Sequence, residues 1–191
     1  MVSLELSSWE TDGDFCKGGN SIIENFGCLP NLEKMKMCSY FIKSLAAGRI
    51  PTRLTTALIQ LKVLKIYCIS FVDDISFVLC LLRSSPNLQG IVIHVDEEEV
   101  AQSPISEFLP VPDYSDVTLN QLREVKLQYI SGTRPEMEFI KLLLENSPIL
   151  EKMSILSNIN LDDEYYEAHY EVLKKLNTYR RASRNAQVIY H

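Results

Sequence analysis

The sequence predicts an α/β fold built from a repeated unit, in which a short strand is followed by a helix. Residues 58–93 and 119–155 are two copies of this unit. Each copy passes from a Leu-x-x-Leu start through an apolar alternation and Ile-Ser to a helical stretch. Each helical stretch ends at Ser-Pro, followed by a leucine and a second short alternation, and the same ending occurs a third time near residue 30. A pattern repeated in this order predicts an array of equivalent units.

The spacing of the alternating runs identifies the class of repeat. One central apolar residue per run can be marked at Met35, Val63, Ile91, Val125, Met153 and Val188. The intervals between them are 28, 28, 34, 28 and 35 residues. A period near 28 residues is typical of leucine-rich repeats. We therefore expect a leucine-rich-repeat solenoid with a curved parallel sheet and helices on its convex side.

The two longer intervals have visible causes. Residues 96–115 form an acidic stretch with three prolines, which predicts an inserted loop, and residues 162–184 predict an extra-long helix. Asp162 is a candidate N-cap of that helix, and its apolar stripe is expected at Tyr166, Tyr170, Leu173 and Leu176. A last strand over 187–190 would complete a cap at the end of the solenoid.

Helical periodicity also marks the connecting segments. Apolar residues at i, i+3, i+4 and i+7 predict two buried helix faces, at Ile75, Val78, Leu79 and Leu82 and at Met137, Ile140, Leu143 and Leu144. Asp73 or Asp74 can cap the first helix, and Pro135 suits the first turn of the second. Residues 40–47, followed by Gly48, predict a shorter helix.

Composition limits the range of functions. The 191-residue chain carries a net charge of -6, which argues against nucleic-acid binding because that depends on Lys and Arg. No apolar run approaches the ~20 residues that span a bilayer, and the first residues predict a strand rather than a signal peptide. Five cysteines without a C-x-x-C pair favour reduced thiols and a cytoplasmic or nuclear location. Cysteines in such a setting are expected to be small buried hydrophobes.

Two segments resemble a known family. The first runs from Tyr129-Ile-Ser-Gly through residues 138–155, and the second covers residues 176–190. Both are similar to the FBD domain, the C-terminal module of plant F-box/FBD/leucine-rich-repeat proteins, and the upstream repeats resemble those that precede it. The resemblance implies a leucine-rich-repeat region over 1–115 and an FBD-like domain over 116–191 that continues the solenoid. Nothing before residue 30 resembles an F-box.

The resemblance implies a protein-interaction scaffold that recognises substrates for a Skp–cullin–F-box ubiquitin ligase. A Skp adaptor would be a partner only if an F-box lies upstream, and the protein substrate is not identified by the sequence. The alternative is a free-standing binding or decoy module without an F-box.

Catalytic and cofactor motifs are absent from the sequence, so we expect no enzymatic activity, no cofactor and no metal. His94 and the acids at 96–99 could suggest a metal or acid–base cluster, but consecutive acids diverge and a solvated loop is the simpler interpretation. Arg180-Arg181-Ala182-Ser183 resembles a kinase site, although such short matches are common.

Leucine-rich repeats bind partners on the strand face. With Val63, Ile91, Val125 and Met153 buried, the exposed residues of that face are expected to include Lys62, Lys65, Gln89, Val92, Arg123, Lys126, Lys152 and Ser154.

Overall fold

The computed structural model describes residues 2–6, 31–39, 50–71, 73–96, 114, 116–158 and 166–191. Seven strands and three helices follow one another in these ranges as β1 (Val2–Leu6), β2 (Leu32–Cys38), β3 (Val63–Ile69), α3 (Ile75–Ser84), β4 (Gly90–Val95), β5 (Glu124–Ile130), α4 (Arg134–Glu145), β6 (Lys152–Ser157), α5 (Tyr166–Thr178) and β7 (Gln187–Tyr190). The predicted helix over 40–47 and most of the predicted loop over 96–115 lie outside these ranges.

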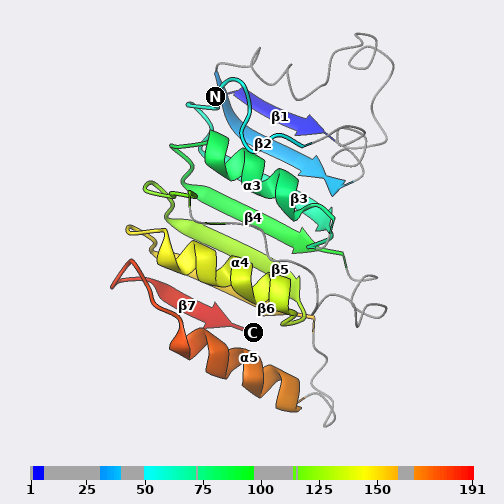
Figure 1. Ribbon diagram of the computed structural model, residues 1–191, viewed down its shortest axis with the longest axis vertical. Helices are drawn as coiled ribbons and strands as arrows, with labels where there is room; N and C mark the ends of the chain where they lie inside the picture. Colours follow the sequence, from blue (N-terminus) through cyan, green and yellow to red (C-terminus); the bar gives the residue numbers. More distant parts are fainter. Residues whose placement is uncertain are drawn as a thin grey trace.

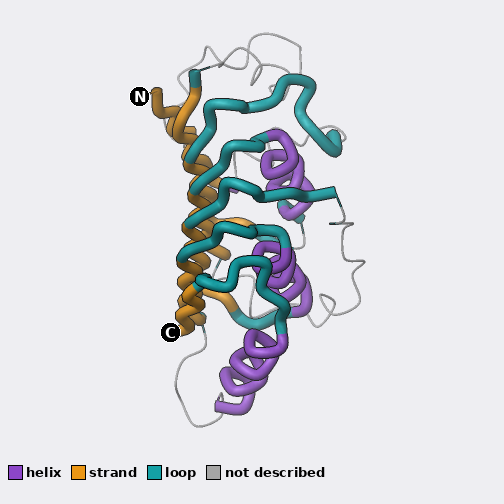
Figure 2. Tube along the Cα trace, turned by 90° about the vertical axis from the view of Figure 1, so that its left-hand side faces the viewer, coloured by secondary structure: helices purple, strands orange, loops and turns teal. Residues whose placement is uncertain are grey.

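The strands form one parallel sheet whose spatial order is their order along the chain, from β1 at one edge to β7 at the other (Figure 1). Parallel neighbours need a connection that leaves the sheet and returns. Figure 2, turned by 90°, shows that the described helices and most described loops lie on the same side of the strands. The predicted α/β class with a parallel sheet is therefore confirmed.

The core lies between the sheet and the helices. One in-register row crosses five strands through Met35, Leu64, Ile91, Val125 and Met153, all of which are buried. The predicted faces of α3 and α4 are buried as well. Side chains alternate between the two faces along each strand. Because this row is buried, the residues directly before and after each of its members point to the other side of the sheet.

The predicted burial of Val63 was wrong by one residue. Leu64 is buried in the row described above, whereas Val63 is half-buried on the opposite face and pairs with Gly90. Residues 63 and 64 are both apolar, so the alternation around them is compatible with two phases. The pairing of Leu64 with Ile91 selects one phase and places Lys65 on the exposed face.

The two predicted copies of the unit share a backbone feature that no residue pattern announces. Cys68 has a φ of 56° and Tyr129 a φ of 64°, which are left-handed values that side chains rarely adopt. Both residues lie where the strand register shifts, and each is followed by a buried isoleucine, Ile69 or Ile130. The same bulge therefore ends β3 and β5.

An acidic side chain stabilises the turn after each bulge. The amide of Ser70 donates to Asp74 Oδ2 at 2.9 Å, and the amide of Ser131 donates to the Glu136 carboxylate at 3.2 Å. Glu136 also accepts from the amide of Thr133 at 2.7 Å, within a capping box at the start of α4. Asp74 is the N-cap of α3, as predicted, although its carboxylate serves the preceding turn rather than a helix amide.

Helix α5 differs from its prediction in orientation. It spans Tyr166–Thr178, within the predicted range of 162–184, and Asp162 lies outside the described residues. Two residues of the predicted stripe are on the surface, Tyr170 with 65% of its area exposed and Leu173 with 36%. Between residues 169 and 178 the buried side chains are those of Val172 and Leu176, which lie one turn apart and face the core, so the prediction was right for Leu176.

Candidate functional site

The side of the sheet away from the helices is a regular surface that runs across all seven strands, and no described helix covers it (Figure 2). We call it the open face and define it by three rows of neighbouring residues. They are a first row of Lys34, Val63, Gly90, Glu124, Lys152 and Gln187, a middle row of Glu5, Lys36, Lys65, Val92, Lys126, Ser154 and Ile189, and a last row of Cys38, Tyr67, His94, Gln128 and Leu156.

Five of the eight residues predicted for the exposed strand face lie on it. Lys65, Val92, Lys126 and Ser154 occupy four consecutive positions of the middle row, and Lys152 belongs to the first row. Lys65, Lys126 and Lys152 are exposed, whereas Val92 and Ser154 are half-buried between their neighbours. The structure therefore brings these residues together on one surface.

The other three predicted residues, Lys62, Gln89 and Arg123, do not belong to the open face. Each immediately precedes a strand, and their backbones are joined by amide-to-carbonyl bonds from Gln89 to Lys62 (2.8 Å) and from Arg123 to Gln89 (2.9 Å). Lys62 pairs with Glu33 of β2, and Arg123 pairs with Glu151 in the turn before β6. The prediction failed here because a residue one position before an outward residue belongs to the opposite phase.

The open face is basic although the chain as a whole is acidic. Its described part carries five lysines and two glutamates, Lys34, Lys36, Lys65, Lys126, Lys152, Glu5 and Glu124. Lys36 pairs with Glu5, and Lys126 Nζ lies 3.2 Å from Glu124 Oε1. Within the described ranges, Lys34, Lys65 and Lys152 have no ion pair or hydrogen bond of their side chains.

Aromatic rings occupy the last row. The Tyr67 and His94 rings are centred 4.4 Å apart, and His94 and Tyr129 are 6.0 Å apart, edge to face. Lys36 Nζ lies 5.3 Å from the centre of the Tyr67 ring, within cation–π range. Burial lowers the pKa of His94 and outweighs the hydrogen bond that the imidazole donates to the Gln128 side chain, which raises it, so burial favours the neutral imidazole. The rings of Tyr67 and His94 in the last row and of Tyr129 in the adjoining bulge form an aromatic shelf beside the lysines.

The sequence prediction missed this aromatic shelf. His94 was considered only with the acids that follow it, of which 97–99 lie outside the described residues. Tyr67 and Tyr129 occupy non-equivalent positions of the two copies, so comparing the copies does not pair them. Their approach depends on the bulges at Cys68 and Tyr129, which only the backbone reveals.

Reactive groups gather nowhere in the part of the chain that the structure describes. No three His, Cys, Asp or Glu residues in it could hold a metal ion, and no helix in it is long and apolar enough to cross a membrane. Cys80 is buried as predicted, and burial raises the pKa of its thiol to about 11. Cys38 is half-buried and Cys68 is exposed, so the prediction of burial was wrong for Cys68. Its position after Tyr67 in the bulge turns its side chain out of the core.

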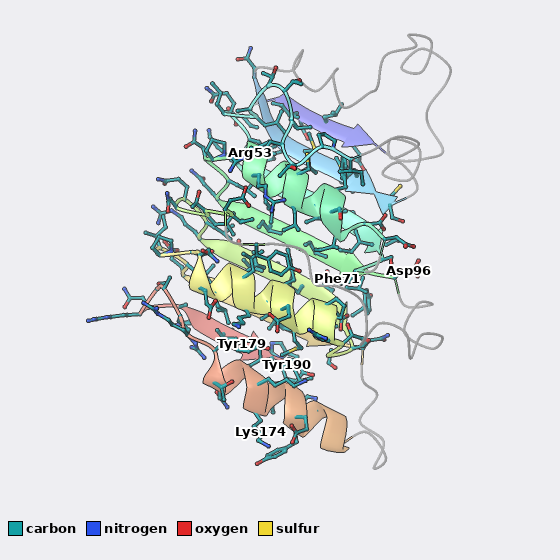
Figure 3. The ribbon with its side chains drawn as sticks, viewed as in Figure 1. Arg53, Phe71, Asp96, Lys174, Tyr179 and Tyr190 are labelled. Carbon is teal, nitrogen blue, oxygen red and sulfur yellow. The ribbon has the colours of Figure 1, made fainter. Side chains whose placement is uncertain are left out.

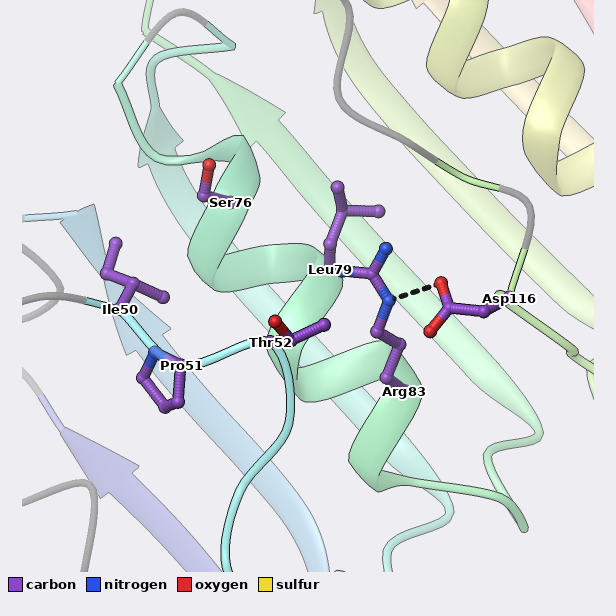
Figure 4. Close-up of a pocket in the computed structure, with 7 residues that line it drawn as sticks. All are labelled: Ile50, Pro51, Thr52, Ser76, Leu79, Arg83 and Asp116. Carbon is purple, nitrogen blue, oxygen red and sulfur yellow. Dashed lines mark hydrogen bonds and ion pairs between the residues drawn. The ribbon is translucent and has the colours of Figure 1, made fainter.

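A cavity of about 390 Å³ lies on the helix side, lined by Ile50, Pro51, Thr52, Ser76, Leu79, Arg83 and Asp116 (Figure 4). Asp116 accepts from Arg83 Nε at 2.8 Å and from Arg53 Nη2 at 3.3 Å. These hydrogen bonds, that of Arg83 above all, lower the pKa of the Asp116 carboxyl. The two charged residues that line this cavity, Arg83 and Asp116, thus pair with each other, and Arg53 adds a second contact to Asp116 from outside the lining, which suits a structural clamp between successive units.

The C-terminal segment packs against the last strands. Ser183 is buried, and its Oγ donates to the Leu150 carbonyl at 2.7 Å, so the hydroxyl of the short kinase-like motif has a structural partner. Tyr179 and Tyr190, labelled in Figure 3, pack against the core near α5. The Tyr190 ring lies 4.6 Å from the His169 ring, and its hydroxyl donates to Ser157 Oγ at 3.3 Å.

Comparison with known proteins identifies the relatives of the chain. The FBD family model matches residues 118–155. The F-box/FBD/LRR-repeat protein At1g13570 of Arabidopsis thaliana is 32% identical over 99% of the chain, and the F-box/FBD/LRR-repeat proteins At5g22660 and At1g78750 of the same plant are 27% and 34% identical over 62% and 56%. The chain covers 45%, 25% and 22% of these relatives' lengths. No solved structure matches the chain.

Proposed function

Because the chain is a relative of the plant F-box/FBD/LRR-repeat proteins, as its sequence motifs predicted, we propose that it recognises protein substrates for a Skp–cullin–F-box ubiquitin ligase. In this role the open face binds the substrate, and an F-box module of the same polypeptide docks the Skp adaptor. The observation that carries the proposal is the regular sheet face, which none of the described helices covers, in a chain that matches the FBD family model.

The proposal treats the sheet and helices as a leucine-rich-repeat solenoid. The in-register residues Met35, Leu64, Ile91, Val125, Met153 and Val188 give intervals of 29, 27, 34, 28 and 35 residues. Three of the five fall in or at the edge of the range of leucine-rich repeats. Matching bulges and Ser-Pro endings support equivalent units. Curvature would make the strand side concave, which is the side that solenoids use for binding.

Affinity capture tests this function. The full-length product of the gene would be tagged in plant cells, and recovered proteins would be identified by mass spectrometry with the wild type, with Val92→Arg on the middle row and with Ile59→Arg as a matched control. Ile59 is 52% exposed and lies in the turn before β3, outside the open face. We expect Val92→Arg to lose the substrate and keep the Skp adaptor, and Ile59→Arg to keep both.

Three outcomes would contradict parts of the proposal. Capture of a substrate without any Skp adaptor would favour the free-standing binding or decoy module. Loss of the substrate with Ile59→Arg but not with Val92→Arg would move recognition away from the open face. Recovery of neither partner by the wild type would remove the ligase function.

A further inference from the structure

We propose that the partner segment bound by the open face is an extended acidic peptide with an aromatic or aliphatic side chain beside its acids. The inference rests on the proposed function, since it assigns a chemistry to the same surface. It is carried by the lysines and the aromatic shelf, which occur together on the open face of a protein whose net charge is -6.

The first step concerns charges that the structure leaves unbalanced. Lys36 and Lys65 are direct neighbours on adjacent strands, which lie roughly 4.8 Å apart. Like charges placed in this way repel, and only Lys36 has a carboxylate partner, Glu5. An acidic side chain bound at Lys65 would relieve the repulsion, so the unliganded face already favours an anion.

The second step concerns spacing. Lys65 and Lys126 flank Val92 in the middle row, two strands apart and thus about 10 Å from each other. An extended peptide crossing the strands presents alternate side chains on one face about 7 Å apart. The flexible lysine stems can close the remaining difference. Two acids separated by one residue therefore match this lysine pair, with the acid at Lys126 replacing its exposed contact with Glu124.

The third step concerns shape. Gly90 leaves the first row without a side chain between Val63 and Glu124, beside Val92. A Cβ added at Gly90 would lie 3.8 Å from Val63, an ordinary contact, and its φ needs no glycine. The fold therefore does not require glycine at position 90 for space. Because glycine has no side chain, a peptide backbone can approach the sheet closely at this position.

The fourth step favours a peptide over a nucleic acid. Glu124 lies in the first row, and burial lowers the pKa of His94, which disfavours a positive charge on its ring. Binding of a nucleic acid gains from the neutralisation of many phosphate charges. The open face instead combines three unpaired lysines with Val92, Leu156 and the aromatic shelf, which suits a peptide with both acidic and apolar side chains.

Fluorescence anisotropy with a defined probe tests the inference. The probe is a labelled twelve-residue peptide of repeated Glu-Thr-Glu-Phe units, compared with its Gln-for-Glu counterpart and with a single-stranded DNA of twelve nucleotides. We expect the acidic peptide to bind the wild-type chain, with affinity falling as salt rises from 50 to 300 mM because screening shortens the reach of the lysine charges. The Gln peptide and the DNA should bind at least 10-fold more weakly.

Variants then locate the site. Lys65→Glu with Lys126→Glu should weaken binding at least 10-fold, whereas Lys174→Glu with Lys175→Glu, which makes the same charge change on exposed residues of α5, should alter it less than 2-fold. Gly90→Thr should weaken binding without a change of charge and without loss of thermal stability. Far-ultraviolet circular dichroism verifies that each variant is folded.

Equal loss with the α5 pair, equal binding of the Gln peptide or tighter binding of the DNA would each overturn the inference. The failure of the proposed function is separate. If Val92→Arg abolishes substrate capture in cells while the acidic probe does not bind, the open face remains the recognition surface and only its proposed preference for acidic peptides falls.

Discussion

Replacing Gly132 with alanine tests how the turn after β5 packs against α5. Gly132 has a φ of +80°, and an added Cβ would lie 2.4 Å from Cγ2 of the buried Val172. A left-handed backbone costs an alanine about 1–2 kcal/mol, and overpacking of this kind costs about 1–3 kcal/mol. The free energy of unfolding should therefore fall by about 2–5 kcal/mol.

A double-mutant cycle separates the two contributions. Val172→Ala alone should cost about 2 kcal/mol, because two methyl groups leave the core, but it removes the atom that the new Cβ would strike. In that background Gly132→Ala should cost only the backbone contribution of about 1–2 kcal/mol. The coupling energy between the two sites is then about 1–3 kcal/mol.

Urea unfolding followed by circular dichroism at 222 nm measures all four members of the cycle, and hydrogen exchange of α5 amides reports local release of that helix. Gly90→Ala is the matched control, since its φ is ordinary and its Cβ has room, so its effect should stay within about 0.5 kcal/mol. Strict additivity of the two substitutions would refute the contact between the turn and α5.

Three further substitutions test the contacts of single polar groups. Glu136→Ala leaves the partly buried turn amides of Ser131 and Thr133 without an acceptor and should lower the free energy of unfolding by about 2–3 kcal/mol in urea titrations; a loss below about 0.5 kcal/mol would contradict its role. The pKa of Asp116 is lowered by Arg83, so its stabilisation is present above the unfolded pKa near 3.8 and is lost as pH falls through the folded value; Asp116→Asn should flatten that acid limb in thermal melts from pH 5 to pH 2. Ser183→Ala removes the hydrogen bond to the Leu150 carbonyl and should cost about 1 kcal/mol, and an unchanged melting temperature would show that the bond adds nothing.

The sequence was a good guide to the elements and to most of the core. Met35, Ile91, Val125 and Met153 are buried in one row as predicted, because each is an apolar residue with polar or small neighbours on at least one side. The start of α4 was predicted equally well, because proline is favoured in the first turn of a helix and Pro135 lies there.

Two predictions failed where the pattern allows more than one solution. Leu176 is compatible with a helical stripe through Tyr170 and Leu173 and with one through Val172, and the packing of Val172 beside Gly132 places the second stripe on the core side. Near Val63 the same ambiguity concerns the phase of a strand. Periodicity specifies that one face is apolar, and tertiary contacts decide which apolar residues occupy it.

The candidate site was harder to predict than the core, for a related reason. Residues of the open face touch few neighbours, so the fold places weak demands on their identity, as the ordinary contact available to a side chain at Gly90 illustrates. Their positions follow from the strand register, but their grouping depends on which strands are adjacent and on the bulges at Cys68 and Tyr129. The buried residues fix the positions of the strands, whereas the exposed residues of the open face can vary. Substitutions on this face can therefore change what it binds without unfolding the sheet. Substitutions at Lys65 or Lys126 should for this reason alter binding far more than stability.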